Sequence, residues 1–171
     1  MKSIQLIIAF VICAVSAFAQ KPDDASMNKL TDDQFVLKAC KMAMKEINLS
    51  KEASNKANSD RVKNFAEMLV RDHSSTNEEL KTIAEKNKFK WHSDKESMDA
   101  HAMSTKTGAE FDKEYIQAMI TDHNKTIELF KMESKNGKNE DLKTFVSKVL
   151  PTLQLHLDSA ISIQSSLEKL Q

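Results

Sequence analysis

Apolar residues recur every three or four positions through four long stretches of this chain, all of them after residue 30. This spacing puts the apolar side chains on one face of a helix, so it predicts amphipathic α-helices rather than strands. We expect the helices to span about residues 31–57, 60–87, 109–136 and 140–171. Four such helices, joined by two short turns and one long connector, predict an all-α four-helix bundle.

Local signals mark several of the expected helix ends. Thr31 and Gln34 form a capping box at the start of the first helix, and Gly137 is placed to end the third. The long connector, residues 88–108, contains a second capping box that begins at Ser93 and predicts a short extra helix. The length of this connector leaves open whether the second and third helices run parallel or antiparallel.

The first nineteen residues have the pattern of a cleavable signal peptide. Lys2 precedes an apolar stretch from Ile4 to Val15, and residues 17–19 form a small-x-small cleavage site. Residues 20–30 read as a polar, flexible arm, and residues 31–171 as the bundle domain. No later stretch reaches the ~18–20 apolar residues that a membrane span needs. We therefore expect an exported protein of the periplasm or cell envelope.

The charge balance argues against a nucleic-acid partner, and the cysteine content argues against an internal disulfide. The chain has 25 basic and 25 acidic residues, and loss of Lys2 leaves 24 against 25, a net charge of −1. Such a balance gives no basic surface for nucleic acid. Only Cys40 remains after cleavage, so no disulfide within the chain is expected. Protein partners are not indicated.

One short pattern occurs twice, fifty positions apart. Residues 65–73 and residues 115–123 both run from an aromatic residue to an Asp-His pair, which is Asp72-His73 in the first copy and Asp122-His123 in the second. Both histidines fall on the apolar stripes of predicted helices. Two imidazoles inside a bundle indicate either a metal site or a buried polar network.

Each predicted helix carries one ionisable residue on its apolar stripe: Glu46, His73, His123 and His156. Counted from the turns, the first three lie at similar heights, while His156 lies up to one turn higher. A buried carboxylate is costly unless it is paired or binds a cation. A glutamate with two or three imidazoles suits iron, zinc, manganese or copper.

The two aspartates Asp72 and Asp122 are further candidate ligands, or partners that accept an N–H from a histidine. The alternative interpretation is a metal-free layer in which Glu46 and the histidines bond to one another and set the register of the helices. No motif of a catalytic site or an organic cofactor occurs. Catalytic residues therefore stay unassigned, and a binding role is favoured over an enzyme.

Three ordered motifs resemble the bacterial family called domain of unknown function 4142. They run from Val62 to His73, from Gly108 to His123, and from Leu150 to Leu157, and the resemblance extends over about residues 31–165. It implies an exported, ferritin-like four-helix bundle without an established activity. Ferritin-like di-iron proteins carry a glutamate three residues before each ligand histidine. Here those positions hold Val70, Ile120 and Leu153, so ferroxidase chemistry is not implied.

Three functions are compatible with these observations. The first is an exported bundle that binds a transition metal through its inward Glu and His residues. The second is a non-enzymatic structural or stress-related envelope protein whose inward residues form a metal-free hydrogen-bonded layer. The third is a carrier of an apolar ligand, held where Pro151 interrupts the backbone bonding of the fourth helix.

Overall fold

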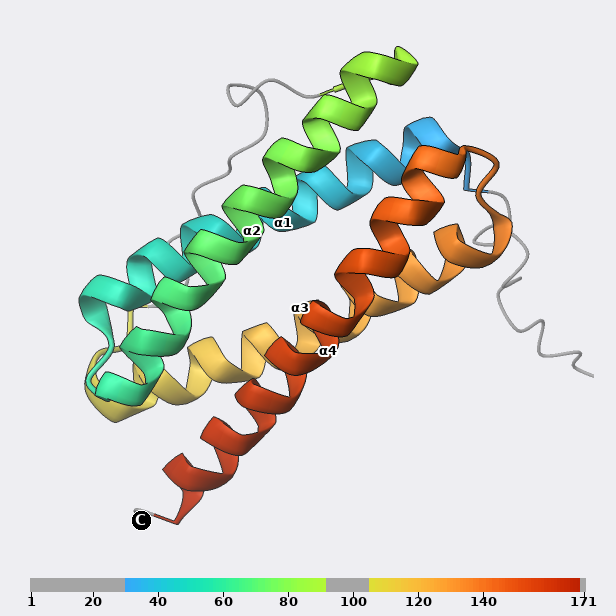
Figure 1. The fold of residues 1–171 in the computed structure, drawn as a ribbon. Coiled ribbons are helices and arrows are strands. Elements are labelled where there is room, and N and C mark those ends of the chain that lie inside the picture. The colour runs from blue at the N-terminus through green and yellow to red at the C-terminus, as the bar shows by residue number, and fades with distance from the viewer. Residues whose placement is uncertain (1–29, 92–104, 170–171) are drawn as a thin grey trace, which may run out of the picture.

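Four long helices make up the described part of the chain. The computed structural model describes residues 30–91 and 105–169, and these ranges contain no strand (Figure 1). The predicted all-α fold is confirmed, with boundaries within a few residues of those expected. The short extra helix expected from Ser93 lies outside the described residues. The helices are α1 (Asp32–Lys56), α2 (Asp60–Asn87), α3 (Gly108–Asn136) and α4 (Glu140–Glu168).

The helices form two hairpins, α1 with α2 and α3 with α4, packed so that α1 lies beside α3 and α2 beside α4. Lys45 of α1 bonds Asp122 of α3, and Ser50, farther along α1, bonds Tyr115, earlier in α3. Neighbouring α1 and α3 are therefore antiparallel. It follows that α2 and α3 run parallel across the diagonal of the bundle, which the sequence had left open.

The turn between α1 and α2 is held by a buried side chain of α3. Ser59 takes the N-cap position of α2 but makes no capping bond with its own side chain. Instead, the Asp112 carboxylate accepts the backbone N–H groups of Asn58 and Ser59 at 2.9 and 2.8 Å. Because Asp112 is only 1 % exposed, these charged hydrogen bonds form in an environment with little water.

Gly137 ends α3, as predicted, but the reason is close packing rather than a left-handed backbone. Its φ is −60°, which any residue can adopt. A Cβ atom at this position would lie 2.5 Å from Oε1 of Glu133 and 2.6 Å from its backbone carbonyl oxygen. The glycine therefore makes room for a buried carboxyl group at this end of the bundle.

The interior consists of two apolar clusters separated by a polar layer. One cluster fills the end that contains the α3–α4 turn, and the other fills the end that contains the α1–α2 turn. Between them lie Glu46, His73, His123 and His156, each at most 5 % exposed. Representative members of the first cluster are Phe35, Leu80, Phe130 and Phe145, and of the second Phe65, Leu69, Tyr115 and Ile163.

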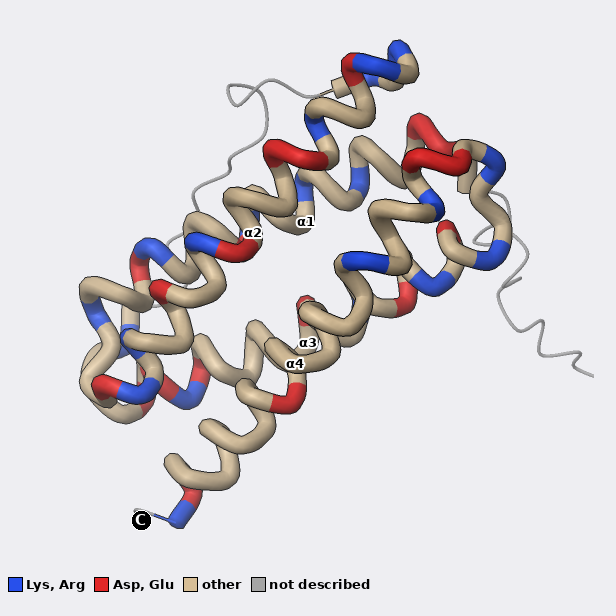
Figure 2. Tube along the Cα trace, viewed as in Figure 1, with Lys and Arg blue, Asp and Glu red and all other residues tan. Residues whose placement is uncertain are grey.

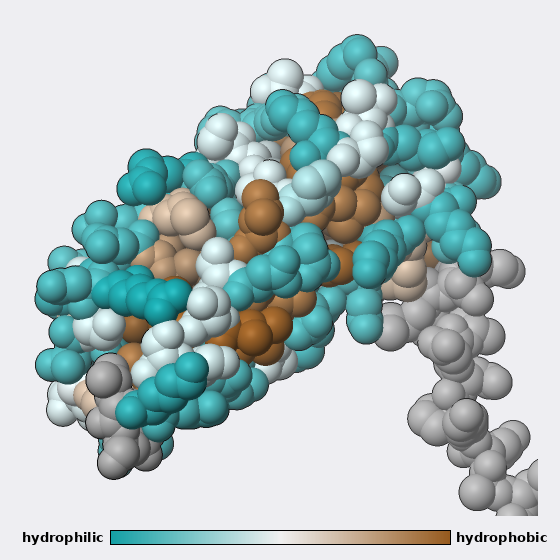
Figure 3. Space-filling view, turned by 60° about the horizontal axis from the view of Figure 1, so that its bottom comes forward, coloured by the Kyte–Doolittle hydropathy of each residue, from teal (hydrophilic) through white to brown (hydrophobic). Residues whose placement is uncertain are grey.

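The outer faces of the helices are polar. Lysines, arginines and acidic residues are interspersed along α1, α2 and α3, whereas the second half of α4 carries few charges (Figure 2). On the face shown in Figure 3, hydrophilic residues surround an apolar strip that runs along the middle of the molecule. Leu155 and Ile161 are the large apolar residues of the described ranges that stay exposed. Within those ranges, no helix has the length and apolar character that crossing a membrane requires.

A candidate metal centre

The polar layer brings together one side chain from each helix. His73 and His123 occupy equivalent places in the repeated sequence, on α2 and α3. Because these helices are parallel and diagonal, equivalent residues of the two copies face each other at the same level. The aromatic residues that begin the copies, Phe65 and Tyr115, also meet, with ring centroids 6.5 Å apart. The repeat thus explains why two of the histidines converge.

His156 completes a triangle of imidazoles rather than lying one turn higher. The ring centroids are 5.4 Å apart for His73 with either His123 or His156, and 5.5 Å apart for His123 with His156. The expected offset is reduced because Cα–Cβ bonds tilt toward the N-terminus of their own helix. In antiparallel α3 and α4 this tilt moves His123 and His156 toward a common level.

The three histidines can each present one ring nitrogen to a shared ion. These nitrogen atoms lie within 4.8 Å of one another, so some point lies within about 2.8 Å of all three (4.8 Å divided by √3). Metal–imidazole bonds are ~2.0–2.1 Å long. Each ring nitrogen would therefore have to move by about 0.8 Å at most (2.8 minus 2.0) to reach bonding distance of an ion at that point.

The hydrogen bonds of two rings determine which nitrogen remains available. Nδ1 of His123 lies 2.9 Å from the Met119 carbonyl oxygen, which only accepts, so Nδ1 carries the hydrogen and Nε2 keeps its lone pair. Nε2 of His156 lies 2.9 Å from Oδ2 of Asp72, so in the neutral ring Nε2–H donates and Nδ1 keeps the lone pair. Both remaining nitrogens, Nε2 of His123 and Nδ1 of His156, are buried without a hydrogen-bond partner.

The pair of Glu46 and His73 completes the layer. Oε2 of Glu46 lies 2.9 Å from Nε2 of His73 and 3.9 Å from Nε2 of His123. The shorter contact pairs the carboxylate with the ring and helps to lower the pKa of Glu46, although its geometry falls short of a well-aligned hydrogen bond. The other carboxylate oxygen, Oε1, accepts a long 3.4 Å bond from the hydroxyl of Thr126. Glu46 therefore lies beside His73 and His123, and free lone pairs remain on Nε2 of His123 and Nδ1 of His156.

The electrostatics favour neutral rings at His123 and His156 beside an ionised Glu46 carboxylate. Burial lowers the pKa of His156 to about 4, although the bond to Asp72 partly opposes this shift. Burial also lowers the pKa of His123, against the attraction of Glu46. For Glu46, burial raises the pKa, but His73 and His123 together outweigh it and the net pKa is lowered. Neutral imidazoles and a carboxylate are the protonation states that bind metal ions.

The two aspartates have different surroundings. Asp72 is 39 % exposed and orients His156 from the surface between α2 and α4. Asp122 instead pairs with Lys45 at 2.6 Å. Neither Asp122 nor Glu46 belongs to the group of ligand atoms that all lie within 4.8 Å of one another, but Glu46 contacts two of the three histidines.

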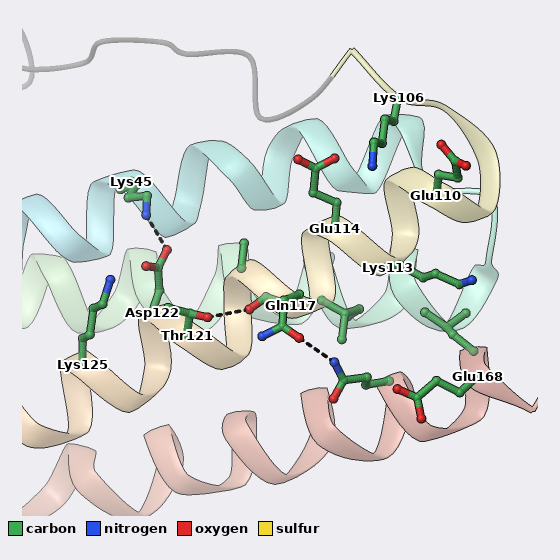
Figure 4. A pocket seen from close by; sticks show the side chains of 14 residues that line it. Lys45, Lys106, Glu110, Lys113, Glu114, Gln117, Thr121, Asp122, Lys125 and Glu168 are labelled. Carbon is green, nitrogen blue, oxygen red and sulfur yellow. Dashed lines mark hydrogen bonds and ion pairs between the residues drawn. The ribbon is translucent and has the colours of Figure 1, made fainter.

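Asp122 and Lys45 lie at one end of an open groove of about 860 Å³ on the outer face of α3 (Figure 4). The groove is lined by basic and acidic side chains in equal number, so its charge does not select for a ligand of either sign.

A small cavity of about 20 Å³ adjoins the polar layer on the side of the α3–α4 turn. Glu46 and His73 form part of its wall, together with Thr76, Asn77 and Thr126. Asn77 is 8 % exposed, and its Oδ1 atom has no hydrogen-bond partner. Sequence reasoning missed Asn77, although its position four residues after His73 on the apolar stripe of α2 was the available signal.

The chain is similar to one protein family in sequence and to several solved structures in fold. The family described as "Domain of unknown function (DUF4142)" matches residues 17–163. No curated protein sequence matches significantly. Among solved structures, "CopM in the Cu(II)-bound form" is 19 % identical, with a TM-score of 0.68 over 80 % of this chain and 98 % of that chain.

Two further structures have the same fold. "CopM in the Ag-bound form" is 18 % identical, with a TM-score of 0.67 over 81 % of this chain and 98 % of that one. A DUF305 protein from Streptomyces coelicolor is 11 % identical, with a TM-score of 0.69 over 80 % of this chain and 92 % of that one. At these identities the likeness is one of fold.

Proposed function

Because the chain belongs to the DUF4142 family, whose description assigns no function, we propose a function from the polar layer itself: the protein binds one divalent transition-metal ion. His73, His123 and His156 supply one nitrogen each, and Glu46 supplies a carboxylate oxygen. Asp72 acts outside the ligand set by holding His156 in the tautomer that leaves Nδ1 free. Asp122 pairs with Lys45 and is not part of the set.

The observation that carries this proposal is the concentration of unsatisfied polar atoms. Six buried side-chain atoms of the described residues lack a hydrogen-bond partner, and four of them are Oε2 of Glu46, Nε2 of His73, Nε2 of His123 and Nδ1 of His156. Each unsatisfied buried group costs about 1–3 kcal/mol. A metal ion within the triangle of imidazole nitrogens would satisfy Nε2 of His123 and Nδ1 of His156, and the Glu46–His73 pair beside them would supply its other two ligands.

The ligand chemistry favours copper(II) among the divalent ions. Imidazole nitrogen with carboxylate oxygen suits copper, zinc, nickel and iron, and copper(II) has the highest affinity in the Irving–Williams order. No thioether or thiolate belongs to the proposed set, so the softer copper(I) and silver ions should bind less tightly. The structures of CopM with copper and silver support the idea that this fold can hold such ions.

The proposed cellular role is binding or buffering of the ion outside the cytoplasm. The signal-peptide pattern of residues 1–19 supports export, although those residues lie outside the described ranges. A structural or stress-related role remains the alternative. It requires a layer that satisfies itself through hydrogen bonds. Glu46 and His73 do pair at 2.9 Å, but Nε2 of His123 and Nδ1 of His156 have no such partner. For an apolar ligand of a carrier, the cavity of about 20 Å³ is too small and the larger groove is lined mostly by charged side chains.

The experiment uses mature protein without a histidine tag, stripped of metal and titrated with copper(II). We expect one ion per chain, and a loss of binding of about 100-fold or more in His73→Gln/His123→Gln, since two ligands are removed. The matched control is His92→Gln/His101→Gln, which removes the two histidines of the chain that are not in the proposed ligand set and should bind as the wild type does. Wild-type protein that takes up no metal, or equal losses in both variants, would reject the proposal.

A further inference from the structure

The small cavity beside the polar layer has features of a ligand site. Glu46 and His73 line it, so an ion held by these two residues would border it. Its volume of about 20 Å³ exceeds the ~10–15 Å³ that one water molecule needs. The remaining wall is mostly apolar, from Ala39, Leu80, Phe130 and Phe145 among others. Because most of the wall is apolar, an occupant can make polar contacts only with Glu46, His73 and the few other polar side chains that line the cavity.

Asn77 supplies a polar contact in that wall. Its Oδ1 atom is buried and unpartnered, so it can accept a hydrogen bond from an occupant. Its Nδ2 group makes only a 3.5 Å contact with Sδ of Met44. Rotation of the amide by 180° therefore loses little and presents an N–H donor to the cavity instead. The same side chain can serve an occupant that donates, such as water, or one that accepts, such as a small anion.

We propose that this cavity holds an exchangeable ligand of the metal ion, with the size of a single water molecule. Water fills the position when no other ligand is present and donates to Asn77. Fluoride, which has nearly the same size, can replace it and accept from the rotated amide. Ligands as large as imidazole are excluded by the apolar wall. This inference rests on the proposed metal site and adds the class of small molecule that the site admits.

Electron paramagnetic resonance of the copper(II)-loaded protein tests the inference, because fluorine-19 and oxygen-17 bound to copper(II) alter its spectrum. We expect oxygen-17 water to broaden the signal and fluoride to split it, whereas free imidazole leaves the spectrum unchanged. Copper that is bound but insensitive to both fluoride and oxygen-17 water overturns the cavity proposal alone. A protein that gives no bound copper signal overturns the metal site itself, so the two failures are distinguishable.

Two variants test whether the cavity is the place of exchange. Asn77→Leu keeps the shape of the side chain but removes its hydrogen bond, and should weaken fluoride binding about tenfold. Ala39→Val fills the cavity and should abolish the fluoride splitting while copper stays bound. Ala66→Val adds the same two carbons to the apolar cluster on the other side of the polar layer and should leave the fluoride response intact. Equal fluoride responses in all three variants contradict the proposal.

Discussion

His156 is held by Asp72 through a 2.9 Å hydrogen bond that joins α4 to α2 at the surface of the bundle. The bond fixes the hydrogen on Nε2 and turns Nδ1 toward the other two histidines. Partners of this kind commonly set the orientation of a metal-binding imidazole. The exposed carboxylate therefore controls a buried nitrogen without approaching the proposed ion.

Replacing Asp72 with alanine should weaken copper(II) binding about 10-fold to 100-fold, the usual effect of losing such a partner. The fold should be little affected, because the Asp72 side chain is 39 % exposed. Isothermal titration of the metal-free protein measures the affinity. Glu79→Ala is the matched control, since it removes a Glu79–Lys148 ion pair between the same two helices. Equal affinities for Asp72→Ala and Glu79→Ala would contradict the role given to Asp72.

Metal binding should stabilise the folded chain, and the stabilisation should grow with the affinity for the ion. An ion that binds only the folded state, at a thousandfold excess over its dissociation constant, adds about 4 kcal/mol to the free energy of unfolding. Thermal unfolding with and without copper(II) measures this difference. In Glu46→Gln, copper(II) should raise the free energy of unfolding by less, because the neutral amide is a poorer ligand than the carboxylate. An unchanged gain in this variant would remove Glu46 from the ligand set.

Much of this arrangement follows from the sequence. The three-four spacing predicts the helices, and the capping box at Thr31 marks the first one, where both reciprocal bonds form. The repeat around His73 and His123 predicts their convergence only once α2 and α3 are known to be parallel. That direction depends on contacts between distant parts of the chain, such as Lys45 with Asp122, which no local pattern encodes.

Other features depend on packing that single residues do not reveal. Asp72 and Asp122 occupy equivalent positions in the repeat, but Asp72 lies near His156 whereas Asp122 lies near Lys45. Nothing within either copy distinguishes them. The sequence also gives no sign of the role of Asp112, which is buried and accepts two backbone N–H groups of the α1–α2 turn.

Asp112→Ala should cost about 3 kcal/mol of folding free energy, because it removes two hydrogen bonds to a charged acceptor and leaves two N–H groups unpaired. Urea unfolding followed by circular dichroism measures the loss. Asp112→Asn keeps one acceptor oxygen and should fall between the wild type and the alanine variant. The control is Asp60→Ala, which removes an acidic residue from the first turn of α2. If Asp112→Ala loses no more stability than Asp60→Ala, the two hydrogen bonds to Asp112 are unimportant for folding.

Glu133 should make the metal-free protein more stable at mildly acid pH than at alkaline pH. Burial and the nearby Asp32 carboxylate raise the pKa of Glu133 from 4.5 to about 7. The folded state therefore holds a proton that the unfolded state releases above pH 4.5. This contribution to stability is present below pH 4.5 and is lost as the pH rises through 7.

The comparison is urea unfolding of wild type and Glu133→Gln at pH 5 and pH 8. Glutamine mimics the protonated acid, so its advantage over the wild type should be larger at pH 8 than at pH 5. Titration of the histidines affects both proteins alike and cancels in the difference. A difference in stability that does not change with pH would show that Glu133 titrates normally.

X-ray absorption spectroscopy of the copper(II)-loaded protein shows directly which atoms bind the ion. We expect a first shell of nitrogen and oxygen at about 2.0 Å, with the outer-shell scattering of three imidazole rings. In His156→Gln that scattering should fall to two rings. A shell dominated by sulfur, or one in which His156→Gln leaves the imidazole count unchanged, would contradict the proposed ligand set.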